Sequence, residues 1–187
     1  VVDETEVSKV MPEINSLTYR GYAAQDLCAK CKFEEVAYLL LHDDLPNSKQ
    51  LEDFEKEERA NRPISENLKS IIKNYPKNAH PMDTTRTSVS HMGLEDPDTA
   101  NNSKEANMRK SMRLLAKIST AVAANFRVRK GQDIIDPDPK LGFCENFFNM
   151  CFGKVPSPEV IKAFDVSMTL YAEHSFNAST FTSRVIT

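Results

Sequence analysis

Prolines that follow short amphipathic segments constrain the fold of this chain more than any other feature of its sequence. Segments of helical periodicity begin at Phe33, Ser48 and Ser65, and each runs up to a proline. Because proline lacks a backbone N–H and disfavours the helical conformation of the residue before it, each proline marks a helix end. Ser48 and Ser65 are the expected N-caps of their helices. The terminating prolines are Pro46, Pro63 and Pro76.

The helical pattern continues through the middle of the chain. Asp83 and Gly93 are the expected N-cap and C-terminal stop of a short helix. The longest helix is predicted over about 104–130, with a stripe of apolar side chains on one face and Gly131 as its stop. A short and strongly apolar helix over 142–153 follows it.

The last predicted helix starts with Ser157 as its N-cap and Pro158 at its first position, where proline is favoured. Its apolar stripe includes Met168 and Tyr171, and His174 continues the stripe one i+3 step later. The periodicity therefore predicts that the helix extends through His174 and carries this histidine on its buried face.

The N-terminal segment differs from the rest of the chain. Its first ~20 residues contain β-branched residues, a proline and a glycine and lack helical periodicity, which indicates short extended segments or a small hairpin. The pattern as a whole predicts an all-α fold with a small extended or β element at the N-terminus. With 187 residues and no linker or repeat, residues 1–187 are expected to form one domain.

Charge and hydropathy exclude two classes of partner. The formal net charge of −3 and a pI near 5.9 argue against a nucleic-acid surface or an anionic membrane surface. Apolar runs are far shorter than the ~20 residues that cross a bilayer, and no signal-peptide pattern opens the chain. We therefore expect a protein of the cytoplasm, with no nucleic-acid or membrane partner.

The four cysteines do not form a zinc-binding pattern. Cys28 and Cys31 form a single CxxC pair, whereas Cys144 and Cys151 are seven positions apart. A structural zinc site needs four ligands, commonly from two close pairs. We interpret all four as reduced, packed thiols and expect no metal. Three of the histidines lack a ligand-spaced partner and are interpreted as structural or surface residues: His42, His80 and His91.

His174 is the candidate for chemistry that the residues themselves suggest. A buried histidine costs free energy unless it is hydrogen-bonded. Asn177, Ser179 and Thr180 follow it and can donate hydrogen bonds without adding charge. This group suits a small oxygen-rich anion, but a hydrogen-bonded core histidine explains the spacing equally well.

Five stretches of the sequence together resemble the citrate synthase family, most closely its short bacterial branch of 2-methylcitrate synthases and citrate synthases. The resemblance runs in order along essentially all 187 residues. It rests on the stretches SLTYRGYAAQDL, FEEVAYLLLHDDLPN, HPMDTTRTSVSHMG, VIKAFDVSMTLYAEH and AEHSFNAST.

The resemblance implies a substrate-binding role for three residues. In this family the histidine of the AEHxFNAST motif binds oxaloacetate, and the matching residue is His174, with Asn177 in the adjoining polar wall. An arginine after LPN also binds substrate, and Arg59 matches its position. Guanidinium groups hold carboxylates with two parallel hydrogen bonds. A solvated helix arginine is the alternative interpretation of Arg59, and Arg62 lies close by.

The resemblance also implies an acyltransferase that condenses acetyl-CoA or propionyl-CoA with oxaloacetate and hydrolyses the thioester, in the tricarboxylic acid or methylcitrate cycle. It implies no cofactor. The family's catalytic histidines, in GPxHGGAN and GFGHR, and its catalytic aspartate have no match in these residues. The chain opens without methionine and closes inside a helical pattern, so we expect it to be the N-terminal part of the family's large helical domain. We expect this piece alone to be inactive.

Two further expectations concern assembly and the alternative function. Family members are usually homodimers, and the small-residue stretch 116–125 is a candidate for the helix pair at the interface, with an ordinary buried helix as the equal alternative. A catalytically inactive helical assembly module is the competing function. A lyase domain of the same fold fits the short bacterial motif less well.

Overall fold

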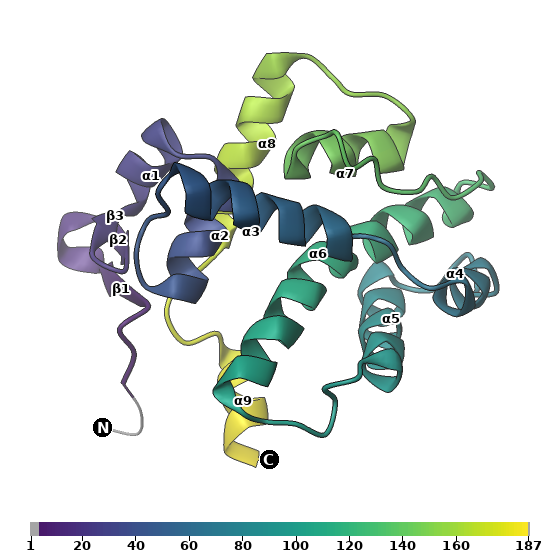
Figure 1. Ribbon diagram of the computed structural model, residues 1–187, viewed down its shortest axis with the longest axis horizontal. Coiled ribbons are helices and arrows are strands. Elements are labelled where there is room, and N and C mark those ends of the chain that lie inside the picture. The colour runs from purple at the N-terminus through teal and green to yellow at the C-terminus, as the bar shows by residue number, and fades with distance from the viewer. Residues whose placement is uncertain (1–3, 187) are drawn as a thin grey trace. The chain divides into compact units, whose positions relative to one another are not determined.

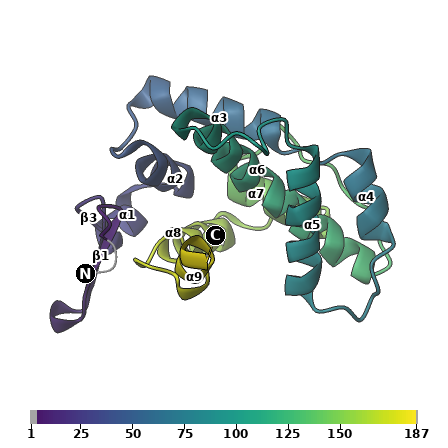
Figure 2. The same cartoon turned by 90° about the horizontal axis from the view of Figure 1, so that it is seen from below.

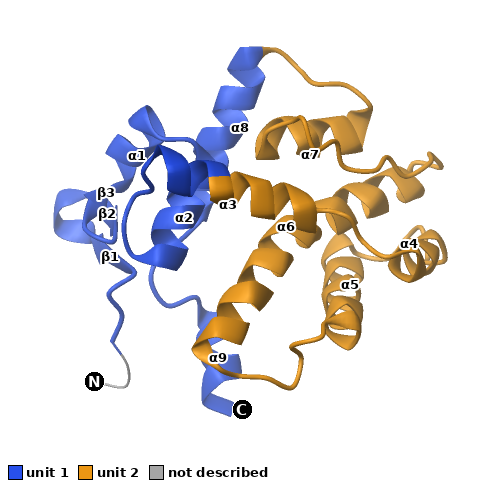
Figure 3. Ribbon diagram, in the orientation of Figure 1, with its two compact units in different colours: residues 1–52, 158–187 blue, residues 53–157 orange. Residues whose placement is uncertain are grey.

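The computed structural model describes residues 4–186, which divide into two compact units. Unit 1 contains residues 1–52 and 158–187, and unit 2 contains residues 53–157, as Figure 3 shows. Within the described residues there are nine α-helices and one small sheet (Figure 1), so the predicted all-α fold with an N-terminal β element is confirmed. Helix α3 (Ser48–Asn61) begins in unit 1 and continues in unit 2.

Unit 1 combines the sheet with four helices. The sheet is antiparallel with strand order β1-β2-β3, and Lys9 pairs with Thr18 while Thr18 pairs with Ala23. A buried cluster centred on Tyr19, Leu27 and Leu39 joins the sheet to helices α1 and α2. The elements are β1 (Ser8–Met11), a 3-10 turn (Pro12–Ile14), β2 (Ser16–Tyr19), β3 (Tyr22–Ala23), α1 (Ala24–Lys30), α2 (Phe33–His42), α8 (Pro158–Tyr171) and α9 (Ala178–Ile186).

Helix α8 packs against α1 and α2 in this unit. Asp165 on α8 is 7% exposed, and its Oδ1 accepts a hydrogen bond of 2.9 Å from the backbone N–H of Phe33, the first residue of α2. A carboxylate at a helix N-terminus satisfies an unpaired backbone donor and complements the helix dipole. This bond fixes α8 on the start of α2.

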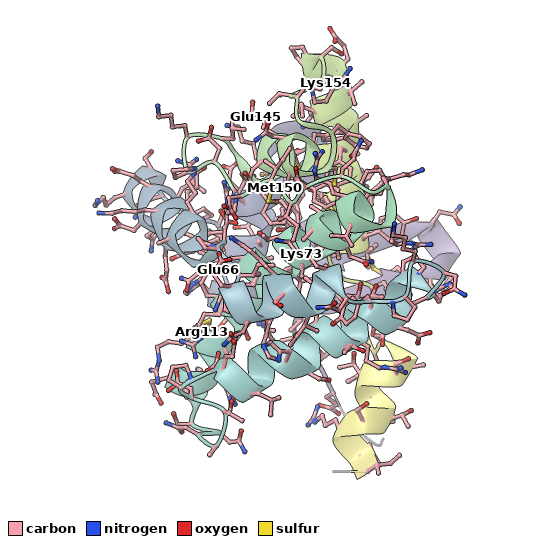
Figure 4. The ribbon with its side chains drawn as sticks, turned by 90° about the vertical axis from the view of Figure 1, so that its right-hand side faces the viewer. Glu66, Lys73, Arg113, Glu145, Met150 and Lys154 are labelled. Carbon is pink, nitrogen blue, oxygen red and sulfur yellow. The ribbon has the colours of Figure 1, made fainter. Side chains whose placement is uncertain are left out.

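Unit 2 is built around the long helix α6, which packs against α4, α5 and α7. Figure 2 shows α4 and α5 close together beside α6. One cluster joins Leu68 and Ile72 of α4 to Met92 of α5 and Ala121 of α6. Met150, 1% exposed, lies on the inner side of α7 (Figure 4). The remaining helices are α4 (Glu66–Lys73), α5 (Pro81–Glu95), α6 (Lys104–Arg129) and α7 (Phe143–Phe152).

Several predicted helix ends are confirmed. The Ser65 side chain accepts a 3.0 Å bond from the backbone N–H of Leu68. Helix α8 begins at Pro158, and Gly131 after α6 has a φ of +71°, the left-handed conformation that glycine adopts without strain.

Two predicted ends of the first helices are wrong. Helix α2 ends at His42, before Pro46, because Asp43 takes a left-handed conformation with φ 74°. Asn47 rather than Ser48 caps α3: the backbone N–H of Gln50 donates to its Oδ1 at 2.9 Å, and Gln50 returns the bond to the Asn47 N–H.

The predicted ends of α5 are also wrong. Its cap is His80, whose Nδ1 accepts from the Met82 N–H at 3.2 Å, with Pro81 at the first helical position, so Asp83 is already inside the helix. Gly93 lies within α5 rather than after it, since the helix continues to Glu95.

Candidate functional site

His174 lies in the loop between α8 and α9, and not on a helix. Helix α8 ends at Tyr171, whose side chain is 87% exposed, and α9 starts at Ala178. The predicted continuation of the helix through His174 onto a buried face is therefore wrong, and His174 is exposed to solvent. The interpretation of His174 as a hydrogen-bonded core histidine is therefore wrong, and the binding of a small anion by this residue stays a prediction.

The carboxylate of Glu173 shapes this loop. Its Oε1 accepts from the backbone N–H of His174 at 2.9 Å, from the backbone N–H of Ser175 at 2.5 Å and from the Ser8 hydroxyl at 3.1 Å. Ser175 has a φ of 76°, a conformation that residues other than glycine seldom adopt. Because Glu173 binds two successive N–H groups that a helix would use, it offers the backbone an alternative to continuing α8.

Tyr19 holds the end of α8 beside the sheet. Its side chain is fully buried, and its hydroxyl lies 2.9 Å from the carbonyl oxygen of Thr169 and 3.2 Å from that of Leu170. These carbonyls belong to the last turn of α8, where the usual i+4 donors are missing; the Thr169 carbonyl also accepts from the Ala172 backbone N–H at 3.3 Å. Burial raises the pKa of the Tyr19 phenol, so the hydroxyl stays a donor at neutral pH. The sheet thereby sets where the loop begins.

Asn177 caps helix α9. Its Oδ1 accepts from the Thr180 backbone N–H at 3.0 Å and from the Thr180 hydroxyl at 3.2 Å. Its side-chain oxygen is therefore used in folding the loop, while its amide group can still donate outward. Phe176 and Phe181 close the turn with an edge-to-face ring contact, with centroids 5.6 Å apart.

The imidazole of His174 makes no hydrogen bond within the described residues, in contrast to its backbone, which Glu173 holds. A fixed backbone that carries an unengaged imidazole can present an N–H to a carboxylate or carbonyl oxygen of a small ligand. Ser179 and Thr180 lie in the first turn of α9, five and six residues after His174, and are also exposed.

Arg59 lies in unit 2, on α3, whereas His174 and Asn177 lie in unit 1. Its Nη2 donates to Glu55 one turn earlier at 2.9 Å, and 31% of its side chain is exposed. Its Nε has no hydrogen-bond partner and is shielded from solvent. Its Nη1 makes no hydrogen bond within the described residues, so Arg59 keeps one donor that a carboxylate ligand could use.

The neighbouring arginine, Arg62, is buried and stabilises the fold of unit 2. Arg62 and Glu58 are each 1% exposed; the Arg62 Nε lies 2.9 Å from both carboxylate oxygens, and its Nη2 lies 2.6 Å from Oε2. The Nη1 of Arg62 donates to the carbonyl oxygens of Asp138 at 3.2 Å and Leu141 at 2.8 Å. Since Arg62 is buried and pairs with Glu58 inside unit 2, Arg59 is the arginine that can meet a ligand.

Sequence reasoning missed the residues that position the loop. The cap of α9 had a visible signal, because an asparagine followed by small and hydroxyl residues is typical of a helix start. The role of Glu173 had no such signal, since Ser8, which bonds to the same oxygen, is 165 positions away.

The four cysteines are thiols in the structure, as predicted. Cys144 and Cys151 are buried, and Cys28 and Cys31 are half-buried. Burial raises the pKa of Cys151 to about 11, which keeps it protonated and unreactive at neutral pH. Among residues 4–186 no group of three or more histidines, cysteines and acids is placed to hold a metal ion. No helix of that part of the chain has the length and apolar character needed to cross a membrane.

The small residues of α6 are buried within a single chain. Ala116, Thr120, Ala123 and Ala124 are at most 2% exposed, and Ala121 is 3% exposed. They permit the close approach of α4, α5 and α7 to this helix. This burial fits the ordinary buried helix, and the interface role of 116–125 stays a prediction.

The sequence profile described as "Citrate synthase, C-terminal domain" matches residues 1–187. The chain belongs to the citrate synthase family. It is 53% identical to the citrate synthase of Mycolicibacterium smegmatis, over all of this chain and 50% of that protein. It is 50% identical to the 2-methylcitrate synthase of Mycobacterium tuberculosis H37Rv, over all of this chain and 47% of that protein. The chain thus spans about half the length of these relatives.

The fold of this citrate synthase family member agrees with solved structures. The crystal structure of citrate synthase from Pyrobaculum aerophilum superposes with a TM-score of 0.92 at 31% identity, over 97% of this chain and 47% of that one. The citrate synthase of Thermotoga maritima gives 0.85 at 28% identity, over the same shares. The family resemblance inferred from the motifs is confirmed, and the roles of His174, Arg59 and Asn177 stay predictions.

Proposed function

We propose that the protein containing this chain condenses an acyl-CoA, acetyl-CoA or propionyl-CoA, with oxaloacetate and hydrolyses the resulting thioester. It would act as a citrate or 2-methylcitrate synthase in the cytoplasm. The observation that carries the proposal is the identity of 50–53% to synthases of both names along the whole chain. No cofactor is required, because the acyl-CoA is itself a substrate.

In this proposal the chain binds substrate and does not itself carry out the proton transfers. The His174 imidazole donates a hydrogen bond to an oxygen of oxaloacetate, and the Asn177 amide donates a second. Arg59 binds a substrate carboxylate through the guanidinium edge that Glu55 leaves open. The exposed position of the His174 ring and the fixed loop backbone support these roles.

General acid–base groups must lie within hydrogen-bond reach of the reacting atoms. The groups that remove a proton from the acyl-CoA and polarise the carbonyl belong, in this proposal, to the half of the family's length that the chain does not span. The 187-residue piece alone is therefore proposed to be inactive, and the complete protein to be a homodimer.

The test is thiol release by the full-length protein, with oxaloacetate and each acyl-CoA in turn. His174→Ala is expected to lower kcat/KM for oxaloacetate on the order of 10- to 100-fold, since a hydrogen bond to a charged group contributes ~1.5–3 kcal/mol. His42→Ala is the matched control, because His42 also belongs to unit 1 but stacks on Tyr38 with centroids 4.2 Å apart.

The ratio of the two acyl-CoA rates decides between the two synthase names. A folded full-length protein that releases no thiol with either substrate would overturn the proposal in favour of an inactive helical assembly module. Equal losses in His174→Ala and His42→Ala would overturn the specific role of His174.

A further inference from the structure

Two residues of the N-terminal sheet contact the end of α8 and the loop that follows it. Ser8 of β1 and Tyr19 of β2 are partners in the antiparallel register, so their side chains lie on the same face of the sheet. Both are buried, with exposed fractions of 7% and 0%. Tyr19 donates to carbonyls in the last turn of α8, and Ser8 donates to the Glu173 carboxylate just beyond that turn. One cross-strand pair thus contacts both the end of the helix and the start of the loop.

The Ser8 hydroxyl bonds to the same carboxylate oxygen that holds the loop backbone. Within the described residues, Ser8 is the only hydrogen-bond partner of the Glu173 carboxylate that comes from outside the loop. A glutamate side chain loses rotamer freedom when it is held in one conformation, and this loss opposes its bonds to the backbone. Because Ser8 is buried in a sheet, it fixes the carboxylate in advance and lowers the cost of forming the two backbone bonds.

The two backbone bonds flank the Cα atom of His174. One N–H belongs to His174 itself and precedes this atom, and the other belongs to Ser175 and follows it. The peptide units on both sides of the Cα are therefore held, and they determine the direction in which the His174 side chain leaves the backbone.

The loop needs this restraint because the conformation of Ser175 is unfavourable. Its φ of 76° is costly for a residue with a Cβ atom and is retained only where the surroundings impose it. The N–H of this same residue donates to Glu173. Weakening the bonds of Glu173 is therefore expected to let Ser175 relax to a negative φ, and this would turn the His174 side chain away from its present direction.

The direction of the His174 ring depends on its backbone, because the ring makes no hydrogen bond within residues 4–186. A binding group that is correctly placed in only a fraction of the molecules has its apparent affinity reduced by that fraction. The contacts that hold the loop thus influence binding at His174 without touching the ligand.

We propose that Ser8 and Glu173 are positioning residues for His174. The N-terminal sheet fixes the Glu173 carboxylate through one hydroxyl, and the carboxylate fixes the backbone from which the imidazole meets its ligand. That this ligand is oxaloacetate rests on the proposed function, whereas the restraint on the loop does not depend on any reaction.

The restraint is tested by hydrogen exchange of the full-length protein, with mass spectrometry of peptides that cover residues 172–177. Ser8→Ala is expected to speed exchange of the amides of residues 174 and 175 about three- to tenfold, the range that one hydrogen bond gives. Ser16→Ala is the matched control. It removes a hydroxyl from the other end of the same hairpin, where the side chain makes no hydrogen bond within the described residues, and exchange is expected to stay unchanged.

The consequence for binding is tested by thiol release with the same variants. Ser8→Ala is expected to raise KM for oxaloacetate by about the factor found in exchange, because both measure the fraction of correctly placed loops. The kcat and the KM for acyl-CoA are expected to stay unchanged. A merely structural role of Ser8 would instead lower Tm and kcat and leave the KM for oxaloacetate unaltered.

A glycine at position 175 tests the role of Glu173. Glu173→Gln keeps the shape but weakens the bonds by removing the charge, and it is expected to raise KM for oxaloacetate about tenfold. Glycine adopts a positive φ without strain, so adding Ser175→Gly to Glu173→Gln is expected to recover about threefold of this loss. If the glycine recovers nothing, the proposed role of Glu173 is wrong.

The remaining outcomes separate this inference from the proposed function. The inference is overturned if exchange at residues 174 and 175 is unchanged in Ser8→Ala, or if Ser16→Ala speeds it equally. It is also overturned if an active protein shows the same KM for oxaloacetate with and without the Ser8 hydroxyl. Faster exchange in Ser8→Ala, together with a parent protein that releases no thiol, supports the positioning of His174 and overturns the proposed reaction.

Discussion

Replacing Arg62 with methionine would test whether the buried pair with Glu58 stabilises unit 2. Methionine keeps most of the side-chain volume but removes the charge and every donor. Glu58 would then be a buried carboxylate without its cation, and breaking a buried pair in this way costs about 3–5 kcal/mol. The carbonyls of Asp138 and Leu141 would also lose the donor they share, which adds to the loss.

The measurement is urea unfolding of the full-length protein, followed by circular dichroism. With a urea m-value of ~1–3 kcal/mol/M, the loss corresponds to a fall in the midpoint of at least about 1 M. Arg59→Met is the matched control, because it makes the same substitution three residues earlier on α3. Its pair with Glu55 is 22–31% exposed and is expected to contribute only ~0.5 kcal/mol.

A double-mutant cycle separates the pair from its surroundings. Glu58→Gln and Arg62→Met are measured alone and together, and their effects should depart from additivity by more than about 1 kcal/mol because the two side chains are in direct contact. The reasoning is refuted if Arg62→Met costs no more than Arg59→Met, or if the two changes at positions 58 and 62 are additive.

Three further outcomes follow from the described contacts. Met150→Ala should destabilise the protein by about 2–5 kcal/mol and lower its Tm, since it leaves a cavity between α7 and α6; no change in Tm would contradict the packing. The Arg113 guanidinium lowers the pKa of Asp96, so this carboxylate adds stability above its unfolded pKa and loses it as the pH falls through its lower folded value. Asp96→Asn should therefore reduce stability near neutral pH and make the loss of stability in acid less steep. If the stability of the variant falls with pH as steeply as that of the parent protein, the ion pair of Asp96 with Arg113, which Figure 4 labels, does not contribute to stability. Cys151, with its pKa raised to about 11, should react with iodoacetamide at pH 8 more slowly than the half-buried Cys28, as peptide mapping of the modified protein would reveal.

Helix ends that depend on neighbouring residues could be predicted from the sequence. The Ser65 cap, the start at Pro158 and the stop at Gly131 are each set by one residue and the turn beside it. Before α5 the predicted cap was Asp83, whereas the observed cap is His80, the residue that precedes Pro81.

The environment of the candidate site could not be predicted in the same way. The i,i+4 spacing of Glu58 and Arg62 indicates contact between them, but their burial depends on a segment 76 to 79 positions further along the chain. For His174, extrapolation of the apolar stripe placed the ring in a core. The structure ends the helix first, because Glu173 and Ser8 meet only after the sheet and α8 have come together.

Because Glu173 holds the loop through hydrogen bonds to its backbone, the conformation of residue 174 does not depend on which side chain it carries. The loop is held through the N–H groups of residues 174 and 175, which every amino acid except proline possesses. Position 174 can therefore accept many side chains without a change in its backbone. In the proposed function, sequence variation at this position would alter substrate binding before it altered the fold, whereas variation at Glu173 would do the reverse.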